Sequence, residues 1–307
     1  MNRSGDPFLS RLARTMVPAS LVAPLLGGCG SGVLDPHGPV GASEKLILLD
    51  SLVIMLAIVV PIILATFLFA WWYRSGNDKA TYRPNWAFSG HLELIVWAIP
   101  TLVIVFLGGI AWFGSQQLDP YRPLASKAKP VEVQVVSLDW KWLFIYPDEH
   151  VASVNRLVIP VDTPVHFVLT ATGAMNSFFV PQLGSQIYTM AGMVSQLNLE
   201  AGQPGVYHGL SAQFSGAGFA GMHFQVHAVS AADYARWLAQ ARSGGAALDQ
   251  AAYRRLEVQS SHVPPMTYRD VAPQLFKDIV DQRFGPAPGP PGGGAGGQDH
   301  PLAEKGA

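Results

Sequence analysis

Residues 131–147 read VEVQVVSLDWKWLFIYP, and at this stretch the chain changes to a β-rich pattern. Four further strand-like runs follow it, set off by Gly and Pro. They are RLVIPVDTPVHFVLTA (156–171), SQLNLEAG (195–202), GVYHGLSA (205–212) and GMHFQVHAVS (221–230). Several short β-rich runs at this spacing predict a sandwich or a barrel. We therefore expect an all-β domain over residues 126–230.

The pattern changes again after this domain. Ser230 is placed to cap a helix over AADYARWLAQAR, and Asp233 favours the positive start of that helix. We expect a short α-helical extension over residues 231–283. Residues 284–307 are rich in Pro and Gly, a composition that predicts a disordered tail.

Two long apolar runs precede the β-rich part. The whole chain is 49% hydrophobic and 13% charged, whereas ordinary soluble domains carry about 25% charged residues. Residues 51–73 and 94–118 contain no charged side chain, and each run exceeds the roughly 20 residues that cross a bilayer. We predict transmembrane helices over about 46–73 and 92–116, within a segment 29–125. The alternative is a buried helix pair of a soluble protein, and the net charge of −1 gives no reason to expect a nucleic-acid partner.

The N-terminus has the order of an export signal. Arg3, Arg11 and Arg14 precede an apolar run that ends in LLGGC, at Cys29. The LLGGC stretch resembles the lipobox of bacterial lipoproteins, which implies a signal peptide over 1–28 and a lipid on Cys29. A plain signal peptide with an incidental cysteine is the alternative. Cys29 is the chain's single cysteine, so an internal disulfide is excluded.

The charges flanking the two spans do not decide the orientation. A lipid on Cys29 would place it outside the cytoplasmic membrane. The first helix would then run inward, residues 74–90 would be cytoplasmic, and everything after about residue 118 would be outside again.

Four motifs, in order, resemble subunit II of the haem–copper oxidases. They are HLELIVWAIP (91–100), LDWKWLFIYP (138–147), NSFFVPQLGSQIY (176–188) and SAQFSGAGFAGM (211–222). The resemblance covers roughly residues 40–240. It implies a two-helix transmembrane hairpin followed by an all-β, cupredoxin-like Greek-key sandwich.

The same resemblance bears on metal binding. In the members that oxidise cytochrome c, two copper ions are held by two histidines, two cysteines, a methionine and a glutamate carbonyl. Only the methionine is kept here, as the positions are occupied by Asn176, Ser211, Gln213, Ser215, Phe219 and Met222. Copper selects thiolates and imidazoles, so these positions are expected to hold no metal, and Met222 is expected to pack in the core.

Three other histidines lie near this loop in the sequence. His208, His223 and His227 are expected to face solvent or to accept and donate hydrogen bonds. Weak adventitious metal binding is the alternative for them.

In lacking these ligands, the chain resembles the quinol-oxidase branch of the family, whose substrate is ubiquinol. The resemblance implies haem b, haem o and one copper in subunit I, with small membrane subunits III and IV, and no cytochrome c partner. This chain would carry no catalytic residue and would cap subunit I in the periplasm, at the bacterial inner membrane. Packing is expected for Trp140 and Trp142, and proton entry for Glu93, for which an interfacial helix-end carboxylate is the alternative.

Two rival functions remain at this point. One keeps the oxidase but takes electrons from cytochrome c, which the missing cysteines oppose. The other is a free-standing membrane lipoprotein that acts in binding or assembly.

Overall fold

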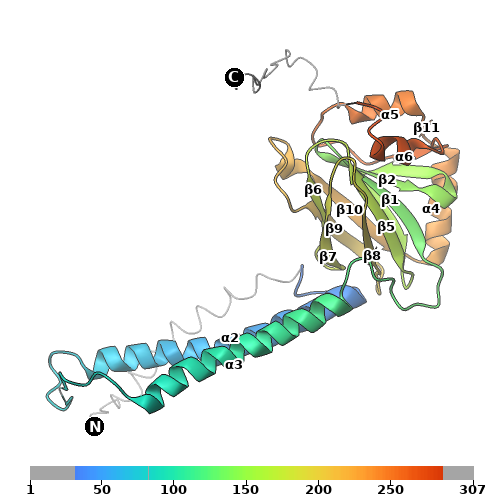
Figure 1. Cartoon of the computed structure of the whole chain (residues 1–307). Helices are drawn as coiled ribbons and strands as arrows, with labels where there is room; N and C mark the ends of the chain where they lie inside the picture. The colour runs from blue at the N-terminus through green and yellow to red at the C-terminus, as the bar shows by residue number, and fades with distance from the viewer. Residues whose placement is uncertain (1–31, 82, 286–307) are drawn as a thin grey trace, which may run out of the picture.

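The computed structural model describes residues 32–81 and 83–285 and shows a long helical hairpin joined to a β-rich domain (Figure 1). The predictions for residues 1–28, for Cys29 and for the tail from residue 286 lie outside the described residues. The helices are α2 (Pro39–Trp72), α3 (Gly90–Gln117), η2 (Pro147–Glu149), η3 (Phe219–Gly221), α4 (Ala231–Ser243), α5 (Gln250–Glu257) and α6 (Leu275–Val280). The strands are β1 (Val131–Leu138), β2 (Lys141–Tyr146), β3 (Val151–Val154), β4 (Arg156–Pro160), β5 (Val165–Ala171), β6 (Asn176–Val180), β7 (Gly184–Thr189), β8 (Ser195–Leu199), β9 (Gly205–Ser211), β10 (His223–Val229), β11 (Ala246–Ala247) and β12 (Met266–Arg269).

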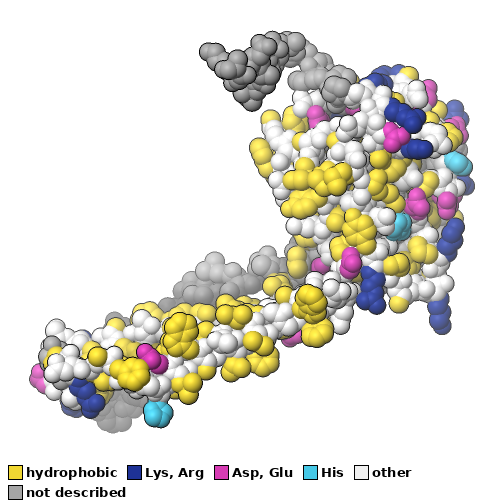
Figure 2. Space-filling model, in the orientation of Figure 1, with side chains coloured by type: hydrophobic (Ala, Val, Ile, Leu, Met, Phe, Trp, Pro, Cys, Tyr) yellow, Lys and Arg dark blue, Asp and Glu magenta, His cyan; other side chains and the backbone are white. Residues whose placement is uncertain are grey.

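The hairpin consists of α2 and α3, which are both long and apolar enough to cross a membrane. Their most apolar windows reach mean hydropathies of 3.0 and 2.5, and no part of either window is buried inside the protein. Hydrophobic side chains cover the hairpin along its length, and charged ones gather at its far tip (Figure 2). A buried soluble helix pair would show the opposite, so that alternative is wrong.

The helix α2 begins earlier than the predicted span. It starts at Pro39, seven residues before the expected position 46. Proline is favoured at the first helical position because its missing N–H has no intrahelical partner there. This additional stretch lies at the junction with the β domain.

The β domain is a sandwich of two sheets. The larger sheet has the order β11-β12-β3-β2-β1-β5-β8, and the smaller has the order β4-β10-β9-β6-β7. Most neighbours are antiparallel, while three pairs are parallel: β1 with β5, β4 with β10, and β11 with β12. Aromatic rings from both sheets meet in the core, where the ring of Phe144 on β2 lies 5.2 Å from that of Phe224 on β10, centroid to centroid. The predicted all-β, cupredoxin-like sandwich is confirmed.

The C-terminal extension adds a third layer to this sandwich. It contains the predicted helices, but it also supplies β11 and β12, and β12 pairs with β3 at the edge of the larger sheet. A second apolar core lies between this layer and the larger sheet, around Leu143, Ile145, Tyr253 and Leu275. The strand β2 is therefore buried on both faces, which explains why its sequence KWLFIY does not alternate between apolar and polar residues.

The hairpin is joined to the smaller sheet through the start of α2. The backbone N–H of Gly41 donates to the carbonyl of Leu183 at 3.0 Å, and Ser185 hydrogen-bonds Glu44. Gly184 has φ +140°, and a Cβ on it would lie 2.6 Å from Val40. Only glycine meets both conditions without strain, so the close approach of helix and sheet depends on it.

Candidate functional site

The loop between β9 and β10 carries four of the six copper-ligand positions predicted from the sequence. It begins after Ser211 and returns at Met222, and the two are joined where Ser211 N–H donates to the Met222 carbonyl at 3.2 Å. The N–H of Ala212 donates to the carbonyl of Ser177 in β6 at 3.0 Å. The loop is thus closed on itself and held against β6, the strand that begins with Asn176.

Asn176 and Ser211 are brought together by this arrangement. Both are buried, with exposed fractions of 2% and 3%. The Ser211 hydroxyl donates to Asn176 Oδ1 at 3.0 Å, and Asn176 Nδ2 donates to Ser137 Oγ at 2.7 Å. Buried polar groups are costly unless they are paired, and here each group satisfies the next. Ser137 was not predicted as a member of this network. The strands β1 and β6 belong to different sheets, and only the fold brings the end of β1 to Asn176.

The other loop positions do not converge on one point. Gln213 contributes its backbone carbonyl, which is 3.2 Å from the Ser211 hydroxyl. The Ser215 hydroxyl is buried and has no hydrogen-bond partner among the described residues. Phe219 packs its ring edge-on against Phe214 at 5.6 Å, and Phe214 is 71% exposed at the loop.

The side chain of Trp140 packs against the β9–β10 loop. It lies at the turn between β1 and β2 with φ +64°, and its indole N–H donates to the Ser215 carbonyl at 3.0 Å. A Cβ on Gly218 would overlap the Trp140 ring, so the indole lies directly on the loop backbone. The packing role predicted for Trp140 is confirmed.

Two more packing predictions are confirmed. Met222 is 1% exposed and belongs to the core between the sheets. Trp142 is fully buried in the same core, in edge contact with Phe178 at 5.6 Å.

The donor set of the loop does not fit a copper centre. Two hydroxyls, a buried amide and a phenyl ring replace the soft thiolates and imidazoles that copper selects. The amide of Asn176 and the hydroxyl of Ser211 are also committed to each other. Within residues 32–81 and 83–285, no group of three or more His, Cys, Asp or Glu is arranged for a metal ion.

The three histidines lie on the outer face of the smaller sheet. His208 and His223 are exposed, and their rings are near each other. His227 is partly buried, and its Nε2 lies 3.2 Å from Gln225 Oε1. Burial, together with the charge of Arg156, lowers the pKa of His227.

Glu93 lies in the first turn of α3, at the tip of the hairpin far from the β domain (Figure 1). Its backbone N–H donates to the Ser89 carbonyl at 3.0 Å, and its side chain is exposed. With a rise of 1.5 Å per residue, it is roughly 35 Å from the other end of α3. Glu93 and the loop are thus at opposite ends of the molecule.

One buried cation was missed by the sequence analysis. Lys141 is 1% exposed, and its ammonium donates to the Val258 carbonyl and to Ser260 Oγ, both at 2.8 Å. Burial lowers the pKa of Lys141 to about 8, against the opposing charges of Asp139 and Glu257. Its position inside the apolar run WKWLFIY was the available signal, since a charged residue in a strand buried on both faces requires partners.

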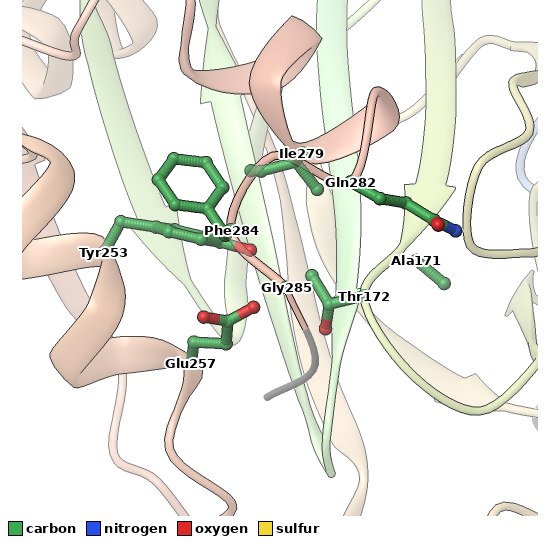
Figure 3. Close-up of a pocket in the computed structure, with 8 residues that line it drawn as sticks. All are labelled: Ala171, Thr172, Tyr253, Glu257, Ile279, Gln282, Phe284 and Gly285. Carbon is green, nitrogen blue, oxygen red and sulfur yellow. The ribbon is translucent and has the colours of Figure 1, made fainter. Parts of the chain in front are cut away.

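A cavity of about 280 Å³ lies beside this cluster, between the extension and β5 (Figure 3). Tyr253 and Phe284 form one wall, with ring centroids 4.8 Å apart, and Glu257 lies below them. Arg254 pairs with Glu257 at 3.2 Å, while burial raises the pKa of Glu257. The cavity was not predicted, because the residues that line it come from segments far apart in the sequence.

Comparison with known proteins shows which families this architecture matches. Residues 108–229 match the family "Cytochrome C oxidase subunit II, periplasmic domain", and residues 242–286 match the "COX Aromatic Rich Motif". The second match coincides with most of the third layer described above.

Relatives similar over most of their length carry consistent names. The cytochrome bo(3) ubiquinol oxidase subunit 2 of Pseudomonas aeruginosa is 43% identical over 98% of this chain and 90% of the relative. The subunit of the same name from Pseudomonas putida is 46% identical over 85% of this chain and 83% of the relative. The ubiquinol oxidase subunit 2 of Acetobacter aceti is 47% identical over 90% of this chain and 89% of the relative. The chain combines a helical hairpin with a two-sheet sandwich, and it is similar to these relatives over most of its length. It therefore belongs to the family of subunit II of the haem–copper oxidases, among the ubiquinol oxidase subunits 2.

Proposed function

We propose that this chain is the second subunit of a proton-pumping terminal oxidase that oxidises ubiquinol and reduces oxygen to water in subunit I. The observation that carries the proposal is the hydrogen-bonded pair Asn176–Ser211, which occupies positions where the cytochrome c branch has copper ligands. A chain without that centre has no acceptor for an electron from cytochrome c. The names of the relatives support a quinol as the donor.

In this proposal the chain carries no redox centre. Haem b, haem o and one copper belong to subunit I, and subunits III and IV complete the complex. The hairpin anchors the chain beside subunit I in the inner membrane, and the sandwich caps subunit I on the periplasmic side. The exposed apolar surface of α2 and α3 supports this arrangement, because such a surface needs lipid or other helices around it.

Glu93 is proposed as a proton entry. With the sandwich in the periplasm, the tip of the hairpin lies at the cytoplasmic face, where protons for oxygen reduction are taken up. Its carboxylate is exposed at the start of α3, so it is accessible both to water and to a neighbouring subunit. An ionisable group at the edge of the membrane is a functional candidate by default.

The decisive experiment compares two electron donors. The complex containing this chain is purified, its haems are recorded, and oxygen consumption is measured with a soluble ubiquinol and with reduced cytochrome c. We expect turnover with ubiquinol and none above background with cytochrome c. Turnover with cytochrome c at a comparable rate would contradict the proposal, and recovery of the chain without any haem subunit would favour a free-standing lipoprotein.

A further inference from the structure

The outer face of β9 and β10 carries a group of imidazoles that the proposed function does not use. The two strands are antiparallel, and their register places His208 opposite Gln225 and His223 opposite Leu210. His223 and Gln225 are two residues apart, so they point to the same face of the sheet. His208 and His223 are therefore diagonal neighbours on the outer face, and both are exposed.

The spacing of the two rings matches that of two imidazoles on one metal ion. Their centroids are 5.0 Å apart, with 36° between the ring planes. A zinc–nitrogen bond is about 2.0–2.1 Å long, and the ring centre lies about 1.2 Å beyond the nitrogen, so two imidazoles at a tetrahedral angle have centroids about 5 Å apart. A single ion can thus contact both rings with little change in the strands.

We propose that His208 and His223 form a bidentate site for a borderline divalent transition-metal ion such as Zn²⁺, with water in the remaining positions. Imidazole nitrogen is a preferred ligand of Zn²⁺ and Cu²⁺, whereas Mg²⁺ and Ca²⁺ prefer oxygen. Both rings reach solvent, so the ion can enter without opening the fold.

The strands hold the two ligands in place. Six consecutive residue pairs join β9 to β10 without a bulge, and the opposite face is packed in the core through Tyr207, Phe224 and Val226. Ligands carried by a rigid sheet lose little freedom when the ion binds, which favours chelation over binding to either histidine alone.

His227 provides a matched comparison on the same face. It follows His223 by four residues on β10, so its side chain shares the orientation. By the same register it is the second diagonal neighbour of His208, but of the two it is His223 whose ring lies against that of His208, while His227 Nε2 lies 3.2 Å from Gln225 Oε1. It belongs to the same surface but not to the proposed site.

The test uses the full chain, purified in detergent with its oxidase partners, and Zn²⁺ in competition with a chromogenic chelator. We expect the wild type to bind one more Zn²⁺ per chain than the double variant His208→Gln/His223→Gln. Each single variant should weaken that binding at least about tenfold, the loss that follows even when a residue that only orients a metal ligand is removed. His227→Gln should bind like the wild type. Equal zinc content and affinity in the wild type and the double variant would overturn the proposal.

A second measurement needs no variant. Diethylpyrocarbonate modifies accessible imidazoles, and peptide mass mapping reports each histidine separately. Zn²⁺ should protect His208 and His223 in parallel, while the exposed His262 stays reactive. Equal modification rates of His208 and His223 with and without Zn²⁺ would count against the site. Quinol turnover does not enter either test, so their outcome is independent of the proposed function.

Discussion

At the scale of single residues, Asn176 connects the strand ends at which the predicted copper-ligand positions lie. Its amide links Ser137 on β1 to Ser211 at the end of β9, and its backbone carbonyl accepts from Thr189 on β7 at 3.4 Å. All of these groups are buried. The buried amide and hydroxyls at these positions therefore satisfy one another by hydrogen bonds.

Replacing Asn176 by alanine should therefore destabilise the protein. The change leaves the Ser211 and Ser137 hydroxyls without their buried partner, and an unsatisfied buried group costs about 1–3 kcal/mol of the free energy of unfolding. The measurement is the thermal unfolding midpoint of the chain in detergent. Gln240→Ala, at an exposed amide of α4, is the control and should change the stability by less than about 0.5 kcal/mol. Equal midpoints for the two variants would show that the network adds nothing to stability.

Glu93 allows a functional prediction at the same scale. Glu93→Gln removes the proton-binding group but keeps nearly the same volume, so quinol turnover should fall while haem content and assembly stay normal. The loss should remain below about 10²-fold, the lower limit for groups that act in the chemical step itself, because an entry residue lies upstream of that step.

Two further variants complete the Glu93 test. Glu93→Asp should keep more activity than Glu93→Gln, because a carboxylate survives. Asp78→Asn, in the loop that joins α2 to α3, should have no effect. Full turnover in Glu93→Gln would leave Glu93 as a helix-end carboxylate.

At the scale of elements, the conformation of the β9–β10 loop is held by contacts that do not involve the side chains at the predicted copper-ligand positions. Its shape depends on Trp140 lying on Gly218 and on its closure between Ser211 and Met222. These contacts involve the backbone and an indole, so they persist whatever occupies the ligand positions. The conformation of the loop and its capacity to hold copper are therefore separate properties.

Copper loading tests that separation. We expect the purified chain to retain no tightly held copper pair and to show no purple absorption after gel filtration with a chelator. The experiment is best done in the His208→Gln/His223→Gln background, so that the outer histidine pair does not contribute. Two retained copper ions per chain with a purple colour would contradict our interpretation of the loop.

The third layer depends on a second element-scale contact, the one made by Lys141 from β2. Its ammonium holds the segment after α5 through Val258 and Ser260. The pKa of about 8 in the folded chain lies below the ordinary value of about 10.4. The unfolded chain therefore binds more protons between these two values, and stability rises with pH in that window.

Lys141→Met should remove this pH dependence. At pH 7.5 the variant loses the hydrogen bonds to Val258 and Ser260, at a cost of about 1–3 kcal/mol. At pH 9.5 the deficit should be larger. The wild-type lysine is then largely neutral and no longer carries the cost of a buried charge, whereas methionine is uncharged at both pH values. Unfolding midpoints at the two pH values provide the measurement, with the exposed Lys277→Met as the control. A deficit that does not grow with pH would contradict the assignment.

At the scale of the whole molecule, the hairpin contacts the sandwich at one end, through the start of α2. Gly184 lets the start of α2 approach β7, and Ser185 and Glu44 add a polar contact there. The tip of the hairpin is consequently far from the β domain (Figure 1). This geometry fits a chain that contacts a membrane partner on both faces of the bilayer.

The lipid expected on Cys29 and the two apolar helices would be separate attachments to the membrane, and they allow a prediction at the scale of the whole molecule. Cys29→Ala should abolish lipid attachment but leave the protein in the membrane fraction after high-salt and carbonate washing. Transmembrane helices insert effectively irreversibly, so the lipid is not needed to keep the chain in the membrane. Mass spectrometry reports the lipid, and fractionation reports the location. Release of the variant into the soluble fraction would show that α2 and α3 do not span the membrane.

The sequence by itself determined the features that depend on local pattern. The resemblance to the oxidase family pointed to Asn176, Ser211, Gln213, Ser215 and Phe219 as copper-ligand positions, and their chemistry is the basis for the prediction that they hold no copper. Charge-free runs predicted α2 and α3, and short β-rich runs predicted the sandwich. Residue chemistry and periodicity are enough for such statements, because they require no knowledge of which strands are neighbours.

Only the tertiary structure decided which distant residues meet. The partners of Asn176 and Lys141, the pairing of β12 with β3 and the diagonal contact of His208 with His223 all follow from strand order and register. A shift of one residue in register reverses the face of every side chain on a strand, and the alternation within each run does not specify its neighbour. The Ser230 cap and the segment AADYARWLAQAR predict only helix for the extension, and its two strands, of 2 and 4 residues, are too short to stand out in the sequence. Strands that short form where the exposed edge of β3 offers unpaired backbone groups, and that edge exists only in the folded sheet.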